Sequence, residues 1–410
     1  MKYLQISIFL IYYFSPPAFA QNCGYIFTPD EKIERFTKGY VRDFNKQIST
    51  RAVVKIPVVV HIVWKNAEEN ISDAQIQSQI DVLNEDFRKK NIDAKDVPGS
   101  FKTVAADCEI EFCLAQKDTL GQPSKGITRR QTTFSEIFTS FSNNRRRIYY
   151  QNSGGVNNWK PDSYLNIWVC NMGSVYGYTS SLKNALITPA EDGIVVDYRA
   201  FGTIGTALSN NSHNKGRTAT HEIGHYFNLL HIWGSDDTCN DDDLVSDTPL
   251  QATANNGCPP FPQLSCGVGN MYMNFMDYTD DNCMGLFTVG QKARMLAALN
   301  EFRSGLLRGS LCTPTATQDI GFQWFIYPNP AKDFIYINLR GASSIKNKSL
   351  ELIDNFGRVL IEKKMPNVTV SGAWQEGVLE IPISNLSNGI YFISLKLDNQ
   401  VLIKKMVVVN

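Results

Sequence analysis

The sequence is poor in histidine and has no surplus of either charge. Five of its 410 residues are histidine, and 40 basic side chains are balanced by 40 acidic ones. A balanced chain presents no overall basic field, so nothing in the composition indicates a nucleic-acid partner. After the first twenty residues, no segment has the eighteen consecutive apolar residues that a membrane-spanning helix requires. We therefore expect a mature protein that neither binds nucleic acid nor spans a membrane.

The first twenty residues have the pattern of a secretory signal peptide. Lys2 is followed by the apolar residues 4–14, which are too few to cross a bilayer, then by two prolines and an Ala-Phe-Ala sequence ending at Ala20. These are the charged region, the apolar region and the A-x-A cleavage site of an exported precursor. A buried N-terminal strand is the alternative. We expect cleavage after Ala20 and a protein that passes through the periplasm to become secreted or displayed at the cell surface.

Composition divides the remaining chain into four segments. Residues 21–51 are polar and have too little apolar surface to fold alone, and we interpret them as a propeptide. Residues 52–312 alternate strand and helix patterns, which is typical of an α/β or α+β domain. A threonine-rich linker, residues 313–320, precedes residues 321–410, which lack histidine and cysteine and contain short alternating strands separated by turn residues. This last pattern predicts a small all-β sandwich.

The central segment opens with a strand and then a helix. Lys55–Trp64 is a continuous apolar run rich in β-branched residues, which is typical of a strand buried on both faces. Ser72 is a candidate N-cap for the following helix. The apolar residues of that helix recur at helical spacing and are Ile76, Ile80, Leu83 and Phe87.

Three of the five histidines lie in HEIGHYFNLLH, residues 221–231. On a helix, His221 and His225 are one turn apart on the same face and can ligate one ion. Glu222 lies beside that face, where it can take a proton from a zinc-bound water. His231 can be the third ligand only if the chain turns after His225. The pattern predicts a catalytic zinc site with Glu222 as the general base; the alternative, an amphipathic helix with chance histidines, is disfavoured by the third histidine.

Asn228 stands where this turn has to occur. Such a turn needs a residue that tolerates positive φ, usually glycine. Asparagine is the commonest non-glycine residue in the left-handed region. We therefore expect Asn228 to end the helix and to bring His231 back toward the metal.

The histidine sequence resembles the extended zinc signature of the metzincin peptidases, with Asn228 where that family usually has glycine. The resemblance implies that Met276 forms a turn beneath the metal and that Tyr278 stabilises the oxyanion of the reaction. Residues from about Val53 to Cys312 are similar to the pappalysin branch, through GRTATHEIGH, VSDTP and MDYTDDNCM. This resemblance implies a secreted endopeptidase acting on protein or peptide substrates. Its fold would be α+β: a twisted mixed sheet with helices, then an irregular C-terminal subdomain.

The loop that follows the histidines is acidic. It contains six aspartates between Asp236 and Asp247. Calcium prefers such oxygen-rich irregular loops, and a solvated acidic loop is the alternative. The pappalysin resemblance implies a structural calcium ion here, for which we expect Asp242, Asp243 and Asp247 as ligands.

The nine cysteines are expected to form disulfides, because export places them in an oxidising compartment. Their odd number leaves at least one thiol unpaired. Four of them allow three pairings, and these are Cys239, Cys258, Cys266 and Cys283. The family resemblance favours Cys239–Cys266 and Cys258–Cys283. The pairing of a further four stays open, and these are Cys108, Cys113, Cys170 and Cys312.

Cys23 is the leftover cysteine and lies within the expected propeptide. A thiolate is a good zinc ligand, so Cys23 can fill the open coordination position and keep the enzyme latent. A cysteine without a role is the alternative. Bacterial pappalysins favour arginine just after the scissile bond, so the resemblance fits self-cleavage at Thr50–Arg51.

The pocket for such an arginine requires a carboxylate. Asp280 or Asp281, beside the methionine turn, can supply it, although both can also be surface charges. The two remaining histidines fall outside the ligand pattern. We interpret His61 as a structural residue of a strand and His213 as a loop residue.

The C-terminal ninety residues resemble the sorting domain of the bacterial type IX secretion system. The likeness lies in YPNPA near residue 330 and in the turn and strand NGIYF. It implies recognition by the secretion machinery; a generic sandwich that binds substrate or carbohydrate is the alternative.

Two other functions are compatible with the zinc pattern. One is a binding or adhesion protein with an inactive zinc site, which the intact Glu222 argues against. The other is a zinc hydrolase of substrates that are not peptides. A substrate-binding edge strand, which YGYTSSL can supply, favours peptides.

Overall fold

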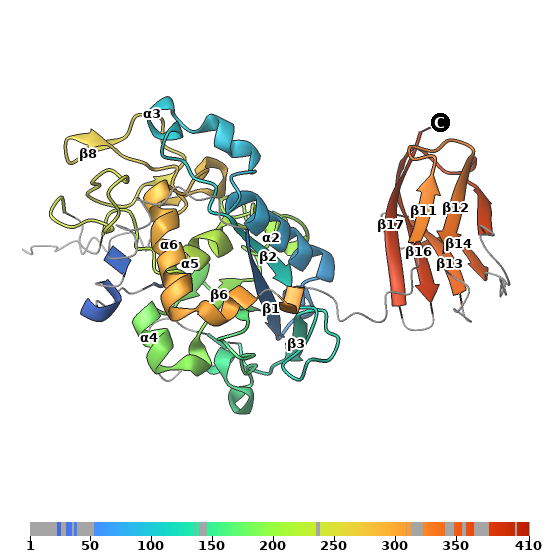
Figure 1. Cartoon of the computed structure of the whole chain (residues 1–410), viewed down its shortest axis with the longest axis horizontal. Coiled ribbons are helices and arrows are strands. Elements are labelled where there is room, and N and C mark those ends of the chain that lie inside the picture. Colours follow the sequence, from blue (N-terminus) through green and yellow to red (C-terminus); the bar gives the residue numbers. More distant parts are fainter. Residues whose placement is uncertain are drawn as a thin grey trace, which may run out of the picture. The chain divides into compact units, whose positions relative to one another are not determined.

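The computed structural model describes residues 23–25, 30–34, 37–38, 53–135, 137–138, 146–234, 238–308, 310–312, 323–340, 348–354, 358–364, 377–397 and 400–409. The expected cleavage sites after Ala20 and at Thr50–Arg51 lie outside these residues. The chain separates into two compact units, Met1–Thr315 and Ala316–Asn410 (Figure 1). No helix of the described residues is long and apolar enough to cross a membrane.

The first unit is built on a mixed sheet of order β2-β1-β4-β6-β5, with β3 pairing β1 beyond the end of β2. Its strands are β1 (Val54–Trp64), β2 (Ile110–Leu114), β3 (Ile127–Gln131), β4 (Leu165–Cys170), β5 (Gly177–Thr179) and β6 (Ile194–Asp197). All pairs are parallel except that of β5, the edge strand, which runs antiparallel to β6. The prediction that the strand within Lys55–Trp64 is buried on both faces is confirmed, since Ile56 to Val63 are all buried.

The unit also contains helices α2 (Asp73–Asp86), α3 (Gly99–Lys102), α4 (Leu182–Ile187), α5 (Arg217–Tyr226) and α6 (Val289–Phe302). Short 3-10 turns are η1 (Ala67–Glu69), η2 (Ile92–Asp96), η3 (Arg147–Tyr149), η4 (Gln151–Ser153), η5 (Pro189–Glu191), η6 (Gly205–Ser209), η7 (Asp281–Cys283), η8 (Ser304–Arg308) and η9 (Ser310–Cys312). Ser72 caps α2 as expected, because its side chain accepts a hydrogen bond from the Gln75 N–H at 3.1 Å. Helices α2 and α5 pack into the same core as alternate residues of β1, with Ile76 and Ile223 among Val58 and Val60. The sheet and α2 thus pack against α5 and fix its position.

An irregular segment follows α5. Its only regular pieces among the described residues are the two-residue strands β7 (Asn256–Gly257), β8 (Leu264–Ser265), β9 (Val268–Gly269) and β10 (Tyr278–Thr279), and η7. Disulfides Cys239–Cys266 and Cys258–Cys283 crosslink it, in the pairing that the family resemblance implied. They stabilise a stretch of chain that has little core of its own.

The sequence did not determine how the other cysteines pair. Cys113 of β2 pairs with Cys312 at the end of the first unit, across 199 residues of sequence. Cys23, Cys108 and Cys170 are free thiols, and all three are buried. The leftover cysteine is therefore one of three.

The second unit is a two-sheet structure. One sheet has the order β11-β12-β15 and the other β14-β13-β16-β17. The strands are β11 (Gln323–Tyr327), β12 (Phe334–Arg340), β13 (Lys348–Asp354), β14 (Val359–Lys364), β15 (Gly377–Pro382), β16 (Gly389–Leu397) and β17 (Gln400–Val408). Ile335 and Ile381 of the first sheet share one core with Leu350 and Ile393 of the second. This is the β-rich C-terminal domain that the sequence predicts.

Candidate metal centre and active site

The three histidines of the motif converge. The Nε2 atom of His225 lies 3.1 Å from Nε2 of His221 and 3.0 Å from Nε2 of His231. The Nδ1 atoms of His221 and His225 donate to the carbonyl oxygens of Phe275 and Leu229, at 2.7 and 2.8 Å. A neutral imidazole that donates from Nδ1 has its lone pair on Nε2. The two helix histidines therefore direct lone pairs toward a common point that His231 also faces.

This donor set fits a zinc ion. Nitrogen ligands about 2.0–2.1 Å from a tetrahedral zinc lie roughly 3.3 Å from one another, close to the separations here. Burial lowers the pKa of His221 to about 4. Burial, together with the neighbouring histidines, takes the pKa values of His225 and His231 well below their usual range. The rings are thus neutral, as metal ligands must be.

Asn228 makes the turn that brings His231 back. It is one of the few non-glycine residues with positive φ, at +70°. The Leu229 N–H bonds to the Gly224 carbonyl at 2.9 Å, and the Asn228 N–H bonds to the His225 carbonyl at 2.8 Å. This pair of bonds is the Schellman arrangement that closes helices with a left-handed residue.

Cys23 completes the cluster of ligand atoms. Its sulfur and one nitrogen of each of the three histidines all lie within 4.8 Å of one another. Cys23 bridges Gly177 of β5 in parallel, and the Gly24 N–H donates to the Gly177 carbonyl at 3.0 Å. The Tyr25 ring stacks on His225, with ring centres 3.8 Å apart. Residues 23–25 therefore cover the histidines and occupy the exposed edge of the sheet.

Glu222 is fully buried beside the histidines. Its Oε2 accepts a hydrogen bond from the Thr179 hydroxyl of β5 at 2.7 Å. Burial raises the pKa of Glu222 to about 7, although hydrogen bonds from Thr179 and Cys23 act in the opposite direction. A carboxyl group with a pKa near neutrality is suited to exchanging protons.

Met276 packs against α5, the helix that carries His221 and His225. It is fully buried, and its sulfur lies against Gly224 so closely that a Cβ on residue 224 would have no room. The Met276 N–H donates to the Asn274 side chain at 2.9 Å, within a tight turn. The methionine turn is therefore fitted to a glycine in the middle of α5.

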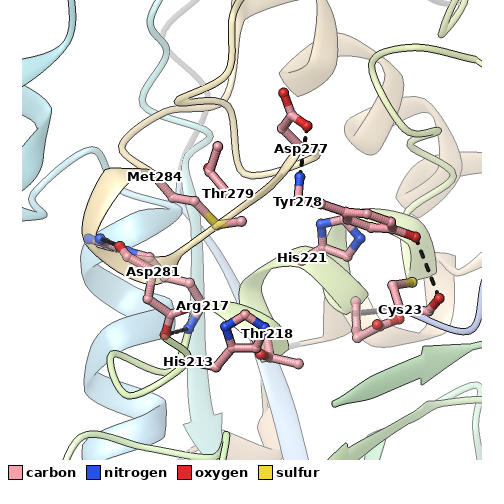
Figure 2. Close-up of a pocket in the computed structure, with 11 residues that line it drawn as sticks. Cys23, His213, Arg217, Thr218, His221, Asp277, Tyr278, Thr279, Asp281 and Met284 are labelled. Atoms are coloured by element: carbon pink, nitrogen blue, oxygen red, sulfur yellow. Dashed lines mark hydrogen bonds between the residues drawn. The ribbon is translucent and has the colours of Figure 1, made fainter. Parts of the chain in front are cut away.

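Tyr278 reaches the site from β10. Its ring lies edge-on to His231, with centres 4.9 Å apart. Its hydroxyl is 3.5 Å from the Cys23 carbonyl oxygen (Figure 2). The phenol thus faces the position that Cys23 occupies.

A pocket opens beside these residues, with Cys23, His221 and Tyr278 at one end and Asp281 and Arg217 at the other (Figure 2). Asp281 is buried, and its carboxylate accepts hydrogen bonds from the Lys215 and Arg217 N–H groups at 2.7 and 3.2 Å. Asp280 is only partly buried and does not line the pocket. Of the two candidate specificity residues, only Asp281 is placed to contact a side chain in the pocket.

Two pocket residues were not identified as such from the sequence. His213, expected only as a loop residue, lines the pocket, and its ring packs edge-on against Tyr176. Arg217 also lines it, but its guanidinium pairs with Asp93 and lies 3.6 Å from Asp86. Neither residue carries a local sequence signal, because their positions follow from how α5 meets the irregular segment.

The three aspartates expected to bind calcium do not form a common cluster; the only group of possible metal ligands among the described residues is that of Cys23 and the histidines. Asp247 accepts hydrogen bonds from the Thr288 hydroxyl and the Gly290 N–H at the start of α6. Asp242 is exposed and bonds to the Leu244 N–H. Asp243 is buried, with one carboxylate oxygen that has no hydrogen-bond partner.

Two protein families match separate parts of the chain. The peptidase M43 family described as pregnancy-associated plasma protein-A matches residues 149–300. The family described as the secretion system C-terminal sorting domain matches residues 325–409.

Curated relatives are extracellular metalloproteases of fungi. That of Pyricularia oryzae is 31% identical over 266 residues, which cover 62% of this chain and 78% of the relative. That of Sordaria macrospora is 36% identical over 269 residues, covering 63% and 79%.

Solved structures show the same relationship. Mature mirolysin of Tannerella forsythia, in complex with a cleaved peptide, is 43% identical and covers 65% of this chain and 100% of its own, with a TM-score of 0.61. A promirolysin variant is 40% identical and covers 71% and 97%, with a TM-score of 0.60. The chain therefore belongs to the pappalysin-type M43 family of metallopeptidases, and it carries a C-terminal secretion sorting domain.

Proposed function

We propose that the protein is a zinc-dependent endopeptidase made as a latent precursor. The observation that carries the proposal is the convergence of the three Nε2 atoms beside the buried carboxylate of Glu222. His221, His225 and His231 would hold the metal. Zinc bound there would polarise the scissile carbonyl and acidify a water molecule.

The chain's own residues supply the remaining chemistry. Glu222 accepts the proton of the attacking water and passes it to the departing amine nitrogen. The Tyr278 phenol donates a hydrogen bond to the carbonyl oxygen as negative charge develops there. Met276 supports the metal-binding helix from below. An extended substrate would pair with the free edge of β5, which favours a peptide over other substrates.

Latency would come from Cys23. In the precursor its sulfur lies among the histidines and residues 23–25 occupy the β5 edge, so neither water nor substrate can bind productively. Cleavage at Thr50–Arg51 would release residues 21–50 and open the site. Promirolysin, a precursor form of a similar protein, is consistent with this proposal.

The pocket would accept an arginine just after the scissile bond. Asp281 is the buried carboxylate at its far end, and a guanidinium can bind such a group. The same preference would make Arg51 a suitable site for self-processing.

We also propose export by a signal peptide, residues 1–20, into the periplasm and then through the type IX secretion machinery, which would recognise residues 321–410. Deletion of the sorting domain should leave the enzyme in the periplasm. We also propose a structural calcium ion at the acidic loop, with Asp242, Asp243 and Asp247 as candidate ligands; the buried Asp243 oxygen without a hydrogen-bond partner supports the choice of Asp243. Metal analysis that finds zinc without calcium would remove that part of the proposal.

The main experiment compares the chain from Ala52 onward with its Glu222→Ala variant. Each is incubated with an unfolded protein, and the new termini are identified by mass spectrometry. We expect Glu222→Ala to lower kcat about 100- to 10,000-fold, as loss of a general base does, with one zinc retained. If neither protein cuts although each holds one zinc, an inactive zinc-containing binding protein becomes the better interpretation.

A further inference from the structure

The propeptide contacts the catalytic unit at a second place, eleven residues after Cys23. Residues 31–34 form a helical turn, in which Asp30 accepts a hydrogen bond from the Ile33 N–H at 3.2 Å. Glu34 then forms a bidentate pair with Arg294 of α6, with N–O distances of 2.8 and 3.0 Å. The Arg294 side chain is 2% exposed and that of Glu34 is 16% exposed, so the pair is largely shielded from water.

The Arg294 side chain is oriented toward the Glu34 carboxylate by a second hydrogen bond. Its Nε donates to the backbone carbonyl of Asn228 at 2.6 Å, which leaves both terminal nitrogens directed at Glu34. The Asn228 side chain in turn donates to the Thr37 hydroxyl at 3.4 Å. The residue that turns the chain between His225 and His231 therefore also contacts the propeptide and its arginine partner.

An apolar contact lies next to the ion pair. Ile33 is buried in a small cluster with Leu182 of α4 and Ala298 of α6. Ala298 is one helical turn after Arg294, so the same face of α6 presents the charge and the apolar surface. Together these residues recognise an isoleucine followed by a carboxylate.

We propose that Arg294, Leu182 and Ala298 form a second docking site that holds the propeptide cooperatively with the contacts of Cys23. The proposal rests on the proposed role of residues 21–51 as a propeptide, but it does not require Cys23 to reach zinc. Two sites on one segment act together, because release at one leaves the segment tethered at high local concentration near the other. Breaking the contact of Cys23 alone would therefore not free the active site; the Glu34–Arg294 pair must also open.

The test measures how fast Cys23 becomes accessible. The full-length chain with Glu222→Ala, which excludes self-cleavage, is treated with iodoacetamide, and alkylation of each cysteine is followed by peptide mass spectrometry. Cys23 is 2% exposed, so it reacts only when the propeptide opens. Glu34→Gln should speed its alkylation roughly 10- to 100-fold, the factor expected when a hydrogen bond to a charged group is weakened. Cys108, also fully buried, reports on global unfolding and should stay protected.

The matched control is Glu31→Gln, which makes the same change on an exposed residue of the same turn and should leave the rate unchanged. A cycle with Arg294→Gln adds a second criterion: the double variant should react no faster than the faster single variant. Alkylation of Glu34→Gln at the unaltered rate, or additive effects in the cycle, would refute the docking site. If Arg294→Gln does not fold, the comparison of Glu34→Gln with Glu31→Gln decides. The proposed function is tested separately: it would be contradicted if the Glu222→Ala variant of the chain from Ala52 onward cut the unfolded protein as fast as the unaltered chain.

Discussion

Gly177 of β5 lies directly against the carboxylate of Glu222, so closely that a Cβ on residue 177 would have no room beside Glu222 Oε1. The edge of the sheet and the proposed base are thus in contact. Gly177→Ala should displace the carboxylate and lower kcat by about 100-fold, since misplacement of a catalytic group by an ångström has an effect of that order. Zinc content should not change. Gly99→Ala, at a glycine with nothing near its Cβ position, is the control; a normal kcat for Gly177→Ala would show that Glu222 adapts freely.

The conformation of Asn228 predicts different effects on stability for two small substitutions. Asn228→Ala places an ordinary Cβ at a φ of +70° and should lower the free energy of unfolding by about 1–2 kcal/mol. Asn228→Gly should change it by less than about 1 kcal/mol, because relief of the left-handed backbone offsets the entropy of the unfolded glycine. Urea unfolding of both variants measures this. Equal stability of the two would mean that backbone conformation is not the reason for asparagine here.

Asp281 and Asp280 should differ as specificity residues although they are adjacent. Asp281→Asn removes the carboxylate charge from the pocket but keeps an oxygen for the Lys215 and Arg217 N–H groups. We expect the preference for arginine over glutamine after the scissile bond, measured as a ratio of kcat/KM, to fall about 10- to 100-fold. Asp280→Asn should leave the ratio unchanged. A ratio insensitive to Asp281 would move the arginine site elsewhere.

His61 should make stability depend on pH. It is fully buried, with Nε2 donating to the Asn166 side-chain oxygen at 3.0 Å and Nδ1 2.7 Å from the Thr128 hydroxyl. Burial lowers its pKa to about 4. The unfolded chain, with a histidine pKa near 6.5, therefore binds the proton more readily. The contribution of neutral His61 is complete above about pH 6.5 and is lost as the pH falls toward 4, up to about 3 kcal/mol.

The measurement compares urea unfolding of the natural chain and of His61→Gln from pH 4.5 to 7.5. The difference in the free energy of unfolding should favour the natural chain most at the alkaline end and shrink steadily below pH 6.5. A difference that does not vary with pH would mean that His61 does not titrate in this range.

The convergence of the three histidines was predictable because metal ligation places strict demands on local sequence. Two histidines one helical turn apart and a third after a left-handed residue leave few alternatives, and the geometry at Asn228 follows the expectation. The general α+β class was predictable for a similar reason, since buried strands such as β1 and capped helices such as α2 carry periodic signals.

Contacts between distant segments were not predictable in this way. The bond from Thr179 to Glu222, the pairing of Cys113 with Cys312 and the Glu34–Arg294 pair join residues that the chain brings together only after it folds. The expected calcium site was only partly predictable. The acidic loop can be recognised from the sequence, but which of its carboxylate oxygens have hydrogen-bond partners depends on tertiary contacts. Asp247, for example, accepts hydrogen bonds from the start of α6.

The disulfide between Cys113 and Cys312 has a mechanical consequence. It joins the last residues of the first unit to β2, which pairs with β1 from Val54 to Val58. Tension applied to the chain beyond Cys312 would reach this ladder of hydrogen bonds rather than unwind η9 and α6 first. A load along paired strands has to break several bonds at once, whereas a helix yields one turn at a time. Force applied through the C-terminal domain would therefore act on the sheet of the first unit, and helix α5 would carry little of it.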